Sequence, residues 1–488
     1  MHKKYLSVFL FFVSLLVFLG LNSNSSVNAA EKTYQIGTDV TYPPFEFANS
    51  NNKYIGIDLE LLNAIAKIEN FKVNIKPVGF NAAVQAMQSG QLDGVIAGMA
   101  ITPERQEKFD FSDPYYKTGF VMAVAKNSSV HRLTQLRGKR VALKTGTAAA
   151  AYAETLKSKY GFKTVIFDDS DNMYNDVITG NSVACFEDQP VMQYAIKTGL
   201  SLKIVTKPAQ GGHYGFAVMK GKNQELLAKF NSGLKKLKAN GEYTKIIHNY
   251  LGTAATNKRQ AANAATQKAN HTFSGLLRQN KDALLAGLSK TIILTLISIV
   301  CATILGIILG LLGVVPNTFL RGLAASLIYL FRGLPLLVLA LFIYNGLPSL
   351  TGTKISAFMA GIITLSLNEG AYTAAFVKGG IEAVETGQME AARSLGLSFS
   401  KAMRKIILPQ GLKMMIPSFI NQFIITLKDT SILSIIGLLE LTQTGKIIIA
   451  RNLEGFRIWT IIAIIYLLLI TVLTWLSKLV ERKLSQTK

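Results

Sequence analysis

Long apolar runs fill the second half of this chain and strongly limit what it can fold into. The runs cover residues 284–315, 324–347, 355–377, 411–436 and 458–476. Each one approaches the roughly 20 residues that a helix needs to cross a bilayer. We therefore predict an all-α domain with five membrane-spanning helices in residues 271–488.

A strongly charged segment separates the third apolar run from the fourth. It carries Glu390, Arg393, Lys401, Arg404 and Lys405 among small residues and a glycine. A segment this polar cannot lie in lipid, so it must protrude into water. Charged residues arranged around small ones are typical of a docking surface.

The N-terminus has the pattern of a secretion signal. Lys3 and Lys4 precede an apolar core at residues 5–21, and small residues follow at 27–30. This order predicts a signal peptide in residues 1–30, cleaved after the alanine at 29 or 30. An uncleaved anchor is the alternative, and in either case the domain that follows lies outside the cytoplasm.

The region after the signal alternates strand-like and helix-like segments. Such alternation is typical of parallel α/β units and predicts an outer domain in residues 31–251. We predict two lobes, one formed by residues 31–115 and 210–251 and the other by residues 116–209, with a ligand cleft between them. Residues 252–270 contain no aromatic or large aliphatic residue, which predicts a linker.

The basic residues indicate which way the spans face. The formal net charge is +23, but no dense run of basic residues is interleaved with aromatics, which argues against nucleic acid as a partner.

Since the α/β domain lies outside, five crossings put the C-terminus inside. The charged segment and the tail, with Lys478, Arg482 and Lys483, then obey the positive-inside rule. The last outer loop, with Lys446 and Arg451, agrees less well.

Several short motifs follow one another along the α/β domain. They read GTDVTYPPFEF from Gly37, GMAITPER from Gly98, DFSDPYY from Asp110, KTGT from Lys144 and EDQP from Glu187. In these motifs and their order, residues 34–251 resemble the polar amino-acid-binding proteins of ATP-driven importers. The resemblance implies a two-lobed clamshell of the type II periplasmic-binding-protein kind that captures a free amino acid.

The same resemblance implies which residues hold the backbone groups of the ligand. An arginine can bind a carboxylate through two hydrogen bonds, and Arg105 occupies that family position. Backbone N–H groups near Thr147 and Ala148 would add donors, and Gly98 belongs to the same motif as the arginine. Asp188 matches the carboxylate that takes the ligand ammonium.

Four further positions match residues that surround the ligand side chain. Tyr42 and Phe80 match an aromatic pair that sandwiches the ligand, and Asp39 and Lys144 match positions that face its side chain. One acceptor and one donor suit a neutral amide, and Lys144 would repel a basic side chain. Glutamine is therefore the predicted ligand.

Two departures from the family pattern leave other ligands open. Ala100 stands where a threonine or serine usually adds a hydroxyl contact to the ammonium, and Glu187 stands beside Asp188 where some relatives carry histidine or glutamine. A second carboxylate could favour a cationic ligand. Glutamate, asparagine and a basic amino acid remain alternatives.

The charged segment between the third and fourth runs contains a motif of its own: Glu-Ala-Ala, three residues, glycine, and a spacer that ends in Leu-Pro. The matching residues are Glu390, Ala391, Ala392, Gly396, Leu408 and Pro409. They resemble the coupling motif of bacterial importer permeases, which implies a type I ABC importer fold whose loop fits a groove on a separate ATPase subunit. Gly396 permits a sharp turn there.

Ionisable residues inside the predicted spans are also functional candidates, because a charge in the bilayer is costly. Glu369, Lys428 and Asp429 are the three that stand out. For the last two, mutual neutralisation near a helix end is the alternative reading.

Some motifs are missing from the sequence. It contains no Gly-x-x-x-x-Gly-Lys-Ser/Thr phosphate loop, no Cys/His metal cluster and no evident nucleophile triad. We expect a transporter subunit in the cell membrane with no enzyme activity, metal or cofactor of its own, and ATP hydrolysis by a partner.

One set of five spans forms one side of a pathway, so a homodimer with two ATPase subunits is expected. A ligand-gated channel or a receptor would need a pore filter or a cytoplasmic domain, which the sequence lacks.

Overall fold

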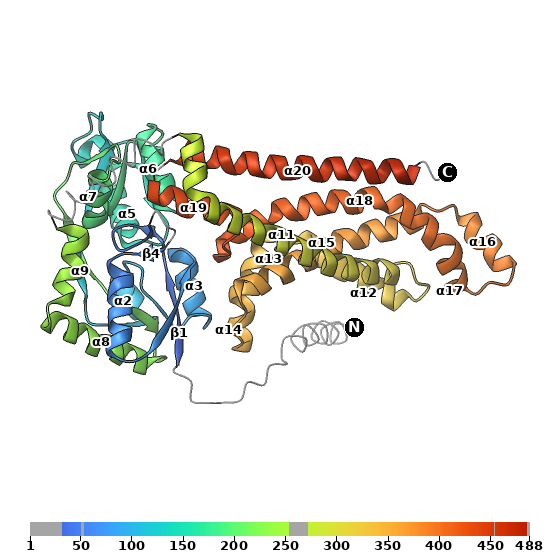
Figure 1. The fold of residues 1–488 in the computed structure, drawn as a ribbon, viewed down its shortest axis with the longest axis horizontal. Helices are drawn as coiled ribbons and strands as arrows, with labels where there is room; N and C mark the ends of the chain where they lie inside the picture. Colours follow the sequence, from blue (N-terminus) through green and yellow to red (C-terminus); the bar gives the residue numbers. More distant parts are fainter. Residues whose placement is uncertain (1–31, 50–52, 253–271, 453, 486–488) are drawn as a thin grey trace.

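The computed structural model describes residues 32–49, 53–252, 272–452 and 454–485. The predicted signal peptide and nearly all of the predicted linker lie outside these described residues. The described chain forms an α/β half, residues 32–252, and a helical half, residues 272–485, joined end to end in one elongated molecule (Figure 1).

The first lobe of the α/β half is built on a five-stranded sheet with strand order β5-β1-β6-β14-β7. Strand β1 pairs in parallel with both β5 and β6. Helix α2 buries Leu61, Leu62 and Ile65 completely, because its apolar stripe faces the core of this lobe. The elements of the lobe are β1 (Thr33–Thr38), β2 (Thr41–Tyr42), β3 (Glu46–Ala48), β4 (Tyr54–Ile55), α2 (Ile57–Ile68), β5 (Lys72–Pro77), α3 (Phe80–Gln88), β6 (Gly94–Val95), α4 (Pro103–Gln106), β7 (Phe109–Phe111), β14 (Ala217–Met219), α8 (Gln224–Ala239) and α9 (Glu242–Leu251).

The second lobe has its own sheet, in the order β10-β9-β11-β8-β12, with β13 also paired to β8. Its elements are β8 (Tyr116–Ala125), η1 (Leu133–Leu136), β9 (Arg140–Lys144), α5 (Ala148–Tyr160), β10 (Lys163–Phe167), α6 (Ser170–Ile178), β11 (Ala184–Asp188), α7 (Gln189–Lys197), β12 (Leu202–Ile204) and β13 (Ala209–Tyr214). Strand β13 pairs with β8, while its last two residues, His213 and Tyr214, also accept hydrogen bonds from the N–H groups of Ile101 and Tyr115. The chain therefore crosses from the second lobe to the first along β13, and the predicted boundary at about residue 210 lies within this strand.

The ends of several strands place polar residues between the two lobes. Asp39 directly follows β1, Lys144 is the last residue of β9, and Asp188 is the last residue of β11. Strands β9 and β11 run parallel, so their carboxyl ends meet at one edge of the second sheet. In α/β proteins the crevice outside the carboxyl ends of the strands is where ligands bind.

The helical half consists of four long helices and several short ones. They are α11 (Phe273–Leu312), α12 (Thr318–Gly333), α13 (Leu336–Leu341), the π-helical turn η2 (Phe342–Gly346), α14 (Leu347–Thr351), α15 (Ala357–Glu382), α16 (Thr386–Ser394), α17 (Phe399–Ala402), the π-helical turn η3 (Met403–Ile407), α18 (Leu408–Asp429), the 3₁₀ segment η4 (Thr430–Ile436), α19 (Leu441–Asn452) and α20 (Gly455–Ser485).

The predicted helical membrane domain is confirmed, although fewer than five of its helices meet the criteria of length and hydropathy for a span among the described residues. Among the described residues, three helices are long and apolar enough to cross a membrane, or four if a bent pair counts as one span. The bent pair is the second predicted run, which turns by 99° between Gly333 and Leu336. Pro335 lies at this break, where it cannot donate the backbone hydrogen bond that would continue the helix.

The third predicted run forms α15, a 26-residue helix that is not among the candidate spans. Half of its residues are buried, including the polar Asn368 and Glu369. A helix enclosed by its neighbours does not need the hydropathy of a lipid-facing one. Its apolar pattern therefore indicated a helix correctly but not how much of it faces other helices.

Helices α11 and α15 pack closely along two glycines. An ideal Cβ added to Gly306 would lie 2.5 Å from Thr373 Cβ, and one added to Gly310 would lie 2.5 Å from Val377 Cβ. Glycines spaced by four residues let two membrane helices approach closely. This contact fixes the centre of the helical half.

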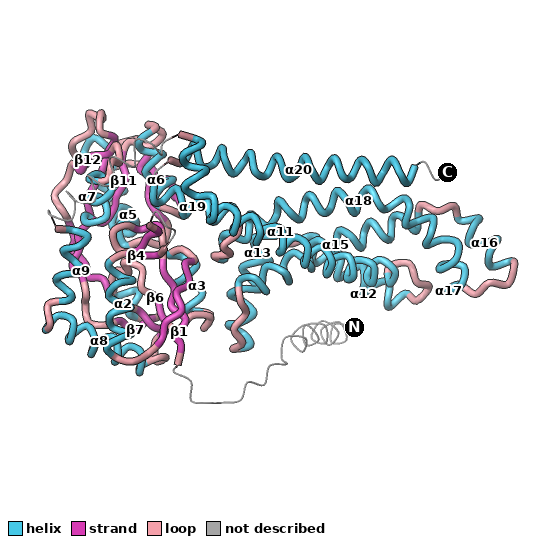
Figure 2. The backbone as a smooth tube through the Cα atoms, in the orientation of Figure 1, coloured by secondary structure: helices cyan, strands magenta, loops and turns pink. Residues whose placement is uncertain are grey.

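The two ends of the helical bundle differ in what lies there. The α/β half covers one end of the helical bundle, where α13 and α19 lie, and α16 and α17 lie at the opposite end (Figure 1). All of the strands belong to the α/β half, while the helical bundle extends away from it (Figure 2). If the α/β half lies outside the cell, α16 and α17 therefore reach the cytoplasm.

The packing of α11 against α15 predicts a sharp difference between two glycine substitutions. Gly310→Ala should lower the thermal unfolding midpoint of the detergent-purified protein, since overpacking costs about 1–3 kcal/mol. Gly322→Ala in α12 is the matched control, because nothing lies within 4 Å of its added Cβ. Equal midpoints for the two variants would contradict this packing.

Candidate functional site

The predicted ligand-binding residues all line one small cavity between the two lobes, of about 20 Å³, together with Ala97. The residues brought together are Asp39, Tyr42, Phe80, Gly98, Ala100, Arg105, Lys144, Thr147, Ala148 and Asp188. They come from both lobes and from positions up to 149 residues apart in the sequence. Their roles toward a ligand stay a prediction.

A buried ion pair joins the lobes at this cavity. Lys144 Nζ of the second lobe lies 2.6 Å from Asp39 Oδ2 of the first, and both side chains are only 3% exposed. The other carboxylate oxygen accepts bonds from the N–H and the hydroxyl of Thr41, at 3.0 and 2.6 Å. Burial alone would raise the pKa of Asp39, but the Lys144 ammonium and these donors hold it below its usual value.

Two adjacent carboxyl groups form the other polar centre of the cleft. The hydroxyl of Tyr42 donates to Asp188 Oδ2 at 2.6 Å and to Glu187 Oε1 at 3.0 Å, and so also joins the lobes. Thr118 donates to Asp188 Oδ1 at 2.9 Å, and Tyr174 donates to Glu187 Oε2 at 2.8 Å. Burial, followed by the charge of Glu187, raises the pKa of Asp188 to about 7. Burial also raises the pKa of Glu187.

Arg105 spans the cleft from the first lobe. Its guanidinium donates to the carbonyl of Ala100 at 2.7 Å and to that of Gly146, in the second lobe, at 2.9 Å. It also lies over the ring of Phe80, 5.3 Å from the centroid. Helix α5 begins at Ala148, and the first N–H groups of a helix have no partner within it. An anion beside Arg105 would meet these donors.

The ring of Tyr42 requires a glycine opposite it. Gly98 has φ +51°, and an ideal Cβ there would lie 2.7 Å from Tyr42 Cε1. The N–H of Gly98 donates to Asp58 Oδ2 at 2.7 Å, which fixes this turn. A glycine is therefore needed here for both backbone conformation and space.

The first lobe is also bonded to the helical half. The carboxamide of Gln91, 6% exposed, donates to the carbonyls of Tyr344 and Ile355 at 2.9 and 2.8 Å and accepts from the N–H of Ile355 at 2.8 Å. Lys354 pairs with Asp93 at 2.8 Å. These contacts hold the first lobe on the segment that connects α14 to α15.

Apolar packing continues this contact. One cluster of buried side chains includes Val78 and Leu92 of the first lobe together with Leu339 and Leu438 of the helical half. Gly437, at φ +72°, approaches so closely that its ideal Cβ would lie 2.2 Å from Val78 Cγ1. The two halves therefore share one core rather than touching at a few points.

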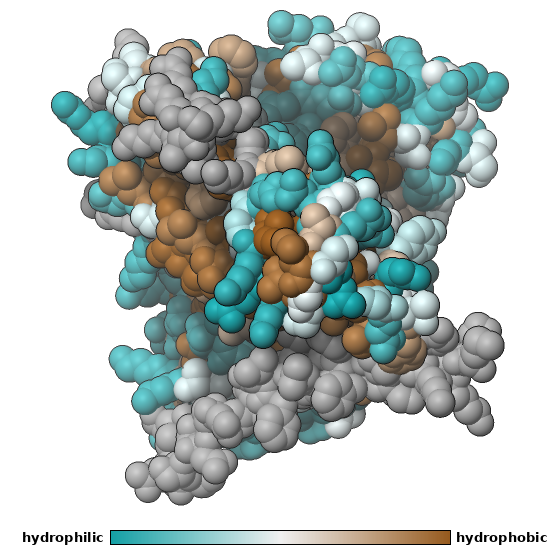
Figure 3. All heavy atoms as spheres, turned by 90° about the vertical axis from the view of Figure 1, so that its right-hand side faces the viewer, coloured by the Kyte–Doolittle hydropathy of each residue, from teal (hydrophilic) through white to brown (hydrophobic). Residues whose placement is uncertain are grey.

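The predicted coupling residues lie at the far end of the bundle. Ala392 is buried, whereas Glu390, Ala391 and Gly396 are exposed, and Gly396 has φ +82°, which fits its predicted sharp turn. Leu395 beside it is 83% exposed. Figure 3 views this end of the molecule and shows hydrophobic residues flanked by hydrophilic ones. Leu408 and Pro409 are the first two residues of α18, where a proline is tolerated.

The ionisable candidates in the spans take different positions. Glu369 is fully buried and accepts a hydrogen bond from the amide of Gln422. Lys428 and Asp429 end α18, as one alternative expected, but they form no ion pair with each other within the described chain. The charge of Lys428 nevertheless acts on the carboxyl group of Asp429, so mutual neutralisation of these two residues stays a prediction.

Two polar residues between the halves, Gln91 and Lys446, were not among the site residues predicted from the sequence. Gln91 had no signal in the sequence, because a single glutamine in a turn resembles any surface residue. Lys446 did have a signal, since it was a basic residue in an outer loop that did not fit the positive-inside rule. Both residues face the contact between the halves.

Comparison with known proteins accounts for both halves of the chain. Residues 34–253 match the bacterial extracellular solute-binding proteins, family 3, and residues 302–486 match the binding-protein-dependent transport system inner membrane component. The arginine-binding extracellular protein ArtP of Bacillus subtilis (strain 168) is 31% identical over 226 residues, which are 46% of this chain and 88% of that protein.

The helical half and the solved structures give further matches. The glutamine transport system permease protein GlnP of Escherichia coli (strain K12) is 37% identical over 184 residues, which are 37% of this chain and 84% of that protein. The crystal structure of substrate-binding domain 2 of Lactococcus lactis GlnP, in an open conformation, is 40% identical, with a TM-score of 0.36, and the match covers 47% of this chain and 99% of that chain. The chain therefore belongs to the polar amino-acid ABC importers, as a membrane protein in which a family 3 solute-binding protein is fused to its permease.

Proposed function

We propose that this protein captures glutamine outside the cell and passes it through its helical half. The observation that carries this proposal is the Asp39–Lys144 pair, which places one acceptor and one donor side by side in the cleft. A side-chain amide offers the complement of both, with an N–H₂ for Asp39 and a carbonyl for Lys144. Arg105 would hold the α-carboxylate of the ligand and Asp188 its ammonium.

The charges in the cleft support a neutral side chain. Asp39 and Lys144 neutralise each other, and the two α-groups of the ligand neutralise Arg105 and Asp188. Burial raises the pKa of Glu187, which disfavours a further negative charge beside Asp188. A cationic or anionic ligand side chain would leave a charge without a partner in a buried site, which is costly.

A basic amino acid is the second candidate, and Glu187 favours it. The carboxyl group of Glu187 lies next to Asp188. The α/β half is also similar to ArtP, which is named as an arginine-binding protein. The permease relative carries glutamine in its name. Lys144 supports glutamine over a basic amino acid, because its ammonium would repel a guanidinium that approached Asp39.

We further propose that transport needs partners. The exposed loop around Glu390 and Gly396, with Leu395 uncovered, would dock into a groove on a separate ATPase subunit that hydrolyses ATP. Two copies of the helical half would form the pathway, so the working unit is a homodimer with two ATPase subunits. No cofactor or metal bound to this chain is part of the proposal.

Calorimetry on purified residues 31–251 with each of the twenty amino acids tests the ligand. Glutamine should bind most tightly. Lys144→Gln should weaken glutamine binding by about tenfold or more, because Asp39 loses its buried partner, and should raise the affinity for arginine relative to glutamine. Lys139→Gln, at the exposed residue that directly precedes β9, is the control and should change nothing. Tighter arginine than glutamine binding in the unaltered domain would favour the second candidate.

The carboxyl pair predicts a pH dependence of ligand binding. Without ligand the pKa of Asp188 is about 7, whereas a bound ammonium favours the ionised carboxylate. Below pH 7 the carboxyl pair of Asp188 and Glu187 must therefore release a proton before the ammonium binds. The affinity for the ligand should thus fall from pH 7.5 to pH 5.5. Calorimetry at pH 6 in buffers of different ionisation enthalpy should detect this proton. Constant affinity over the range would refute the mechanism.

The contact around Gln91 predicts a separation of binding from uptake. Gln91→Ala leaves the carbonyls of Tyr344 and Ile355 and one N–H without their partner, at about 1–3 kcal/mol for each buried group. Uptake of labelled glutamine by cells should fall severalfold while the affinity of the α/β half stays unchanged. Gln85→Ala, which removes one exposed bond to Asn345, should have a much smaller effect. Equal uptake by the two variants would contradict a role for this docked arrangement.

A further inference from the structure

A second and much larger cavity lies between the α/β half and the helical half. Its volume is about 350 Å³, within the range of roughly 300–1,000 Å³ that is usual for small-molecule pockets. We call it the chamber. All three parts of the molecule contribute to its walls: Asp39, Phe80 and Asn81 from the first lobe, Asp169 and Asp171 from the second, and Ser434, Gln443 and Lys446 from the helical half.

The chamber adjoins the ligand cleft. Asp39 and Phe80 line both cavities, so only these two side chains and their neighbours separate them. Asp39 is also one half of the ion pair that closes the cleft. A ligand that leaves the cleft past Asp39 would therefore enter the chamber directly.

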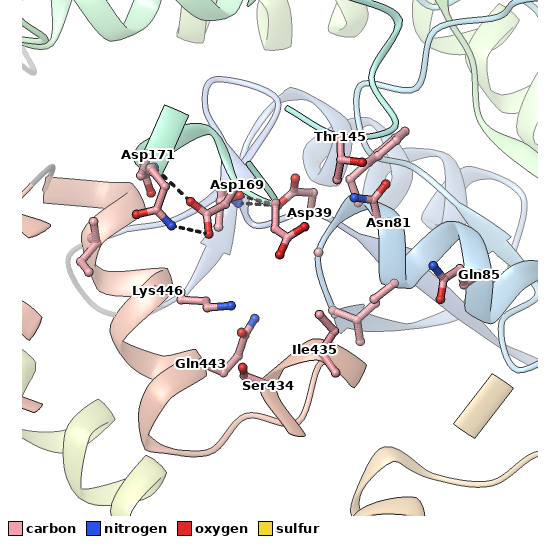
Figure 4. A pocket seen from close by; sticks show the side chains of 18 of the residues that line it. Asp39, Asn81, Gln85, Thr145, Asp169, Asp171, Ser434, Ile435, Gln443 and Lys446 are labelled. Carbon is pink, nitrogen blue, oxygen red and sulfur yellow. Dashed lines mark hydrogen bonds between the residues drawn. The ribbon is translucent and has the colours of Figure 1, made fainter. Parts of the chain in front are cut away.

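Opposite charges face the chamber from opposite sides. Asp169 and Asp171 lie at the start of α6 in the second lobe, and Lys446 extends from α19 in the helical half. Figure 4 shows Lys446 and Gln443 pointing toward the middle of the chamber, with Asp39 across from them. Lys446 forms no ion pair with any described residue, so its charge is available inside the chamber.

Two buried polar side chains in the walls also have uncommitted hydrogen-bonding groups. The side chain of Gln443 is 6% exposed and that of Asp171 is 7% exposed, and neither side chain forms a hydrogen bond within the described parts of the chain. Buried polar groups are normally bonded. Burial, followed by the charge of Asp169, raises the pKa of Asp171 well above its usual value, and an ammonium group bound beside these two carboxyl groups would favour the ionised form of Asp171. These groups together match a small ligand that carries both charges.

We propose that the chamber is a second binding site for a zwitterionic amino acid on its way from the cleft into the helical half. Lys446 and the amide of Gln443 bind the α-carboxylate, and Asp169 with Asp171 binds the α-ammonium. The inference rests on the proposed function of the cleft. It also explains why a lysine lies in an outer loop, against the positive-inside rule, since its partner there is the ligand carboxylate rather than a membrane surface.

The experiment uses the full chain in detergent, with the cleft disabled by Asp188→Asn, and glutamine as the probe. Saturation-transfer NMR detects weak binding, and we expect a signal from the chamber in this background. Adding Lys446→Gln should weaken that binding by about tenfold or more, because a charge-assisted hydrogen bond is lost, whereas Lys446→Arg should retain it. Residues 31–251 with Asp188→Asn, which lack one wall of the chamber, should give no signal.

The outcomes separate this inference from the proposed function. Two results would overturn the chamber site even if the unaltered cleft binds glutamine normally. The first is no NMR signal from the full chain with Asp188→Asn. The second is a signal that does not change when Lys446→Gln is added to that variant. No amino-acid binding by the unaltered residues 31–251 would instead refute the function proposed for the cleft. A signal that depends on Lys446 and persists with arginine there would support the site.

Discussion

The ion pair between Asp39 and Lys144 determines how the rest of the α/β half works. It is buried, it joins the two lobes, and its length of 2.6 Å leaves no room for a ligand group between the partners. Two charges out of water are tolerated only when they are close and further hydrogen-bonded, which Thr41 provides on the Asp39 side. A ligand can therefore replace this contact only by offering both an acceptor and a donor.

The two lobes relate differently to the membrane. The first lobe shares a hydrophobic core with the helical half and adds the three hydrogen bonds of Gln91 and the Lys354–Asp93 pair. The second lobe meets the helical half around the chamber, where Asp169 and Asp171 lie across from Lys446. Because the first lobe is bonded to the bundle through these contacts, we expect the clamshell to open by movement of the second lobe. Such a movement would change the cleft and the chamber together, since residues of the second lobe line both.

The α/β half and the loop that contains Glu390 and Gly396 lie at opposite ends of the helical bundle, as the charge pattern predicted (Figure 1). Their separation means that an event at Gly396 can reach the cleft only through the packed helices. The close approach of α11 to α15 at Gly306 and Gly310 lies on that route. A rigid contact of this kind transmits displacement better than a loosely filled core does, because packed interiors have low compressibility.

The sequence by itself determined the two kinds of domain, their order, and the residues that gather at the cleft, because motifs and hydropathy patterns are local properties of a chain. Hydropathy did not register the 99° bend at Pro335 in the second apolar run, nor that half of the residues of α15 are buried. Only the tertiary structure decided that Gln91 bonds the halves together and that Lys446 faces two aspartates. These contacts join residues more than 250 positions apart, and no local pattern encodes which distant group a side chain will meet.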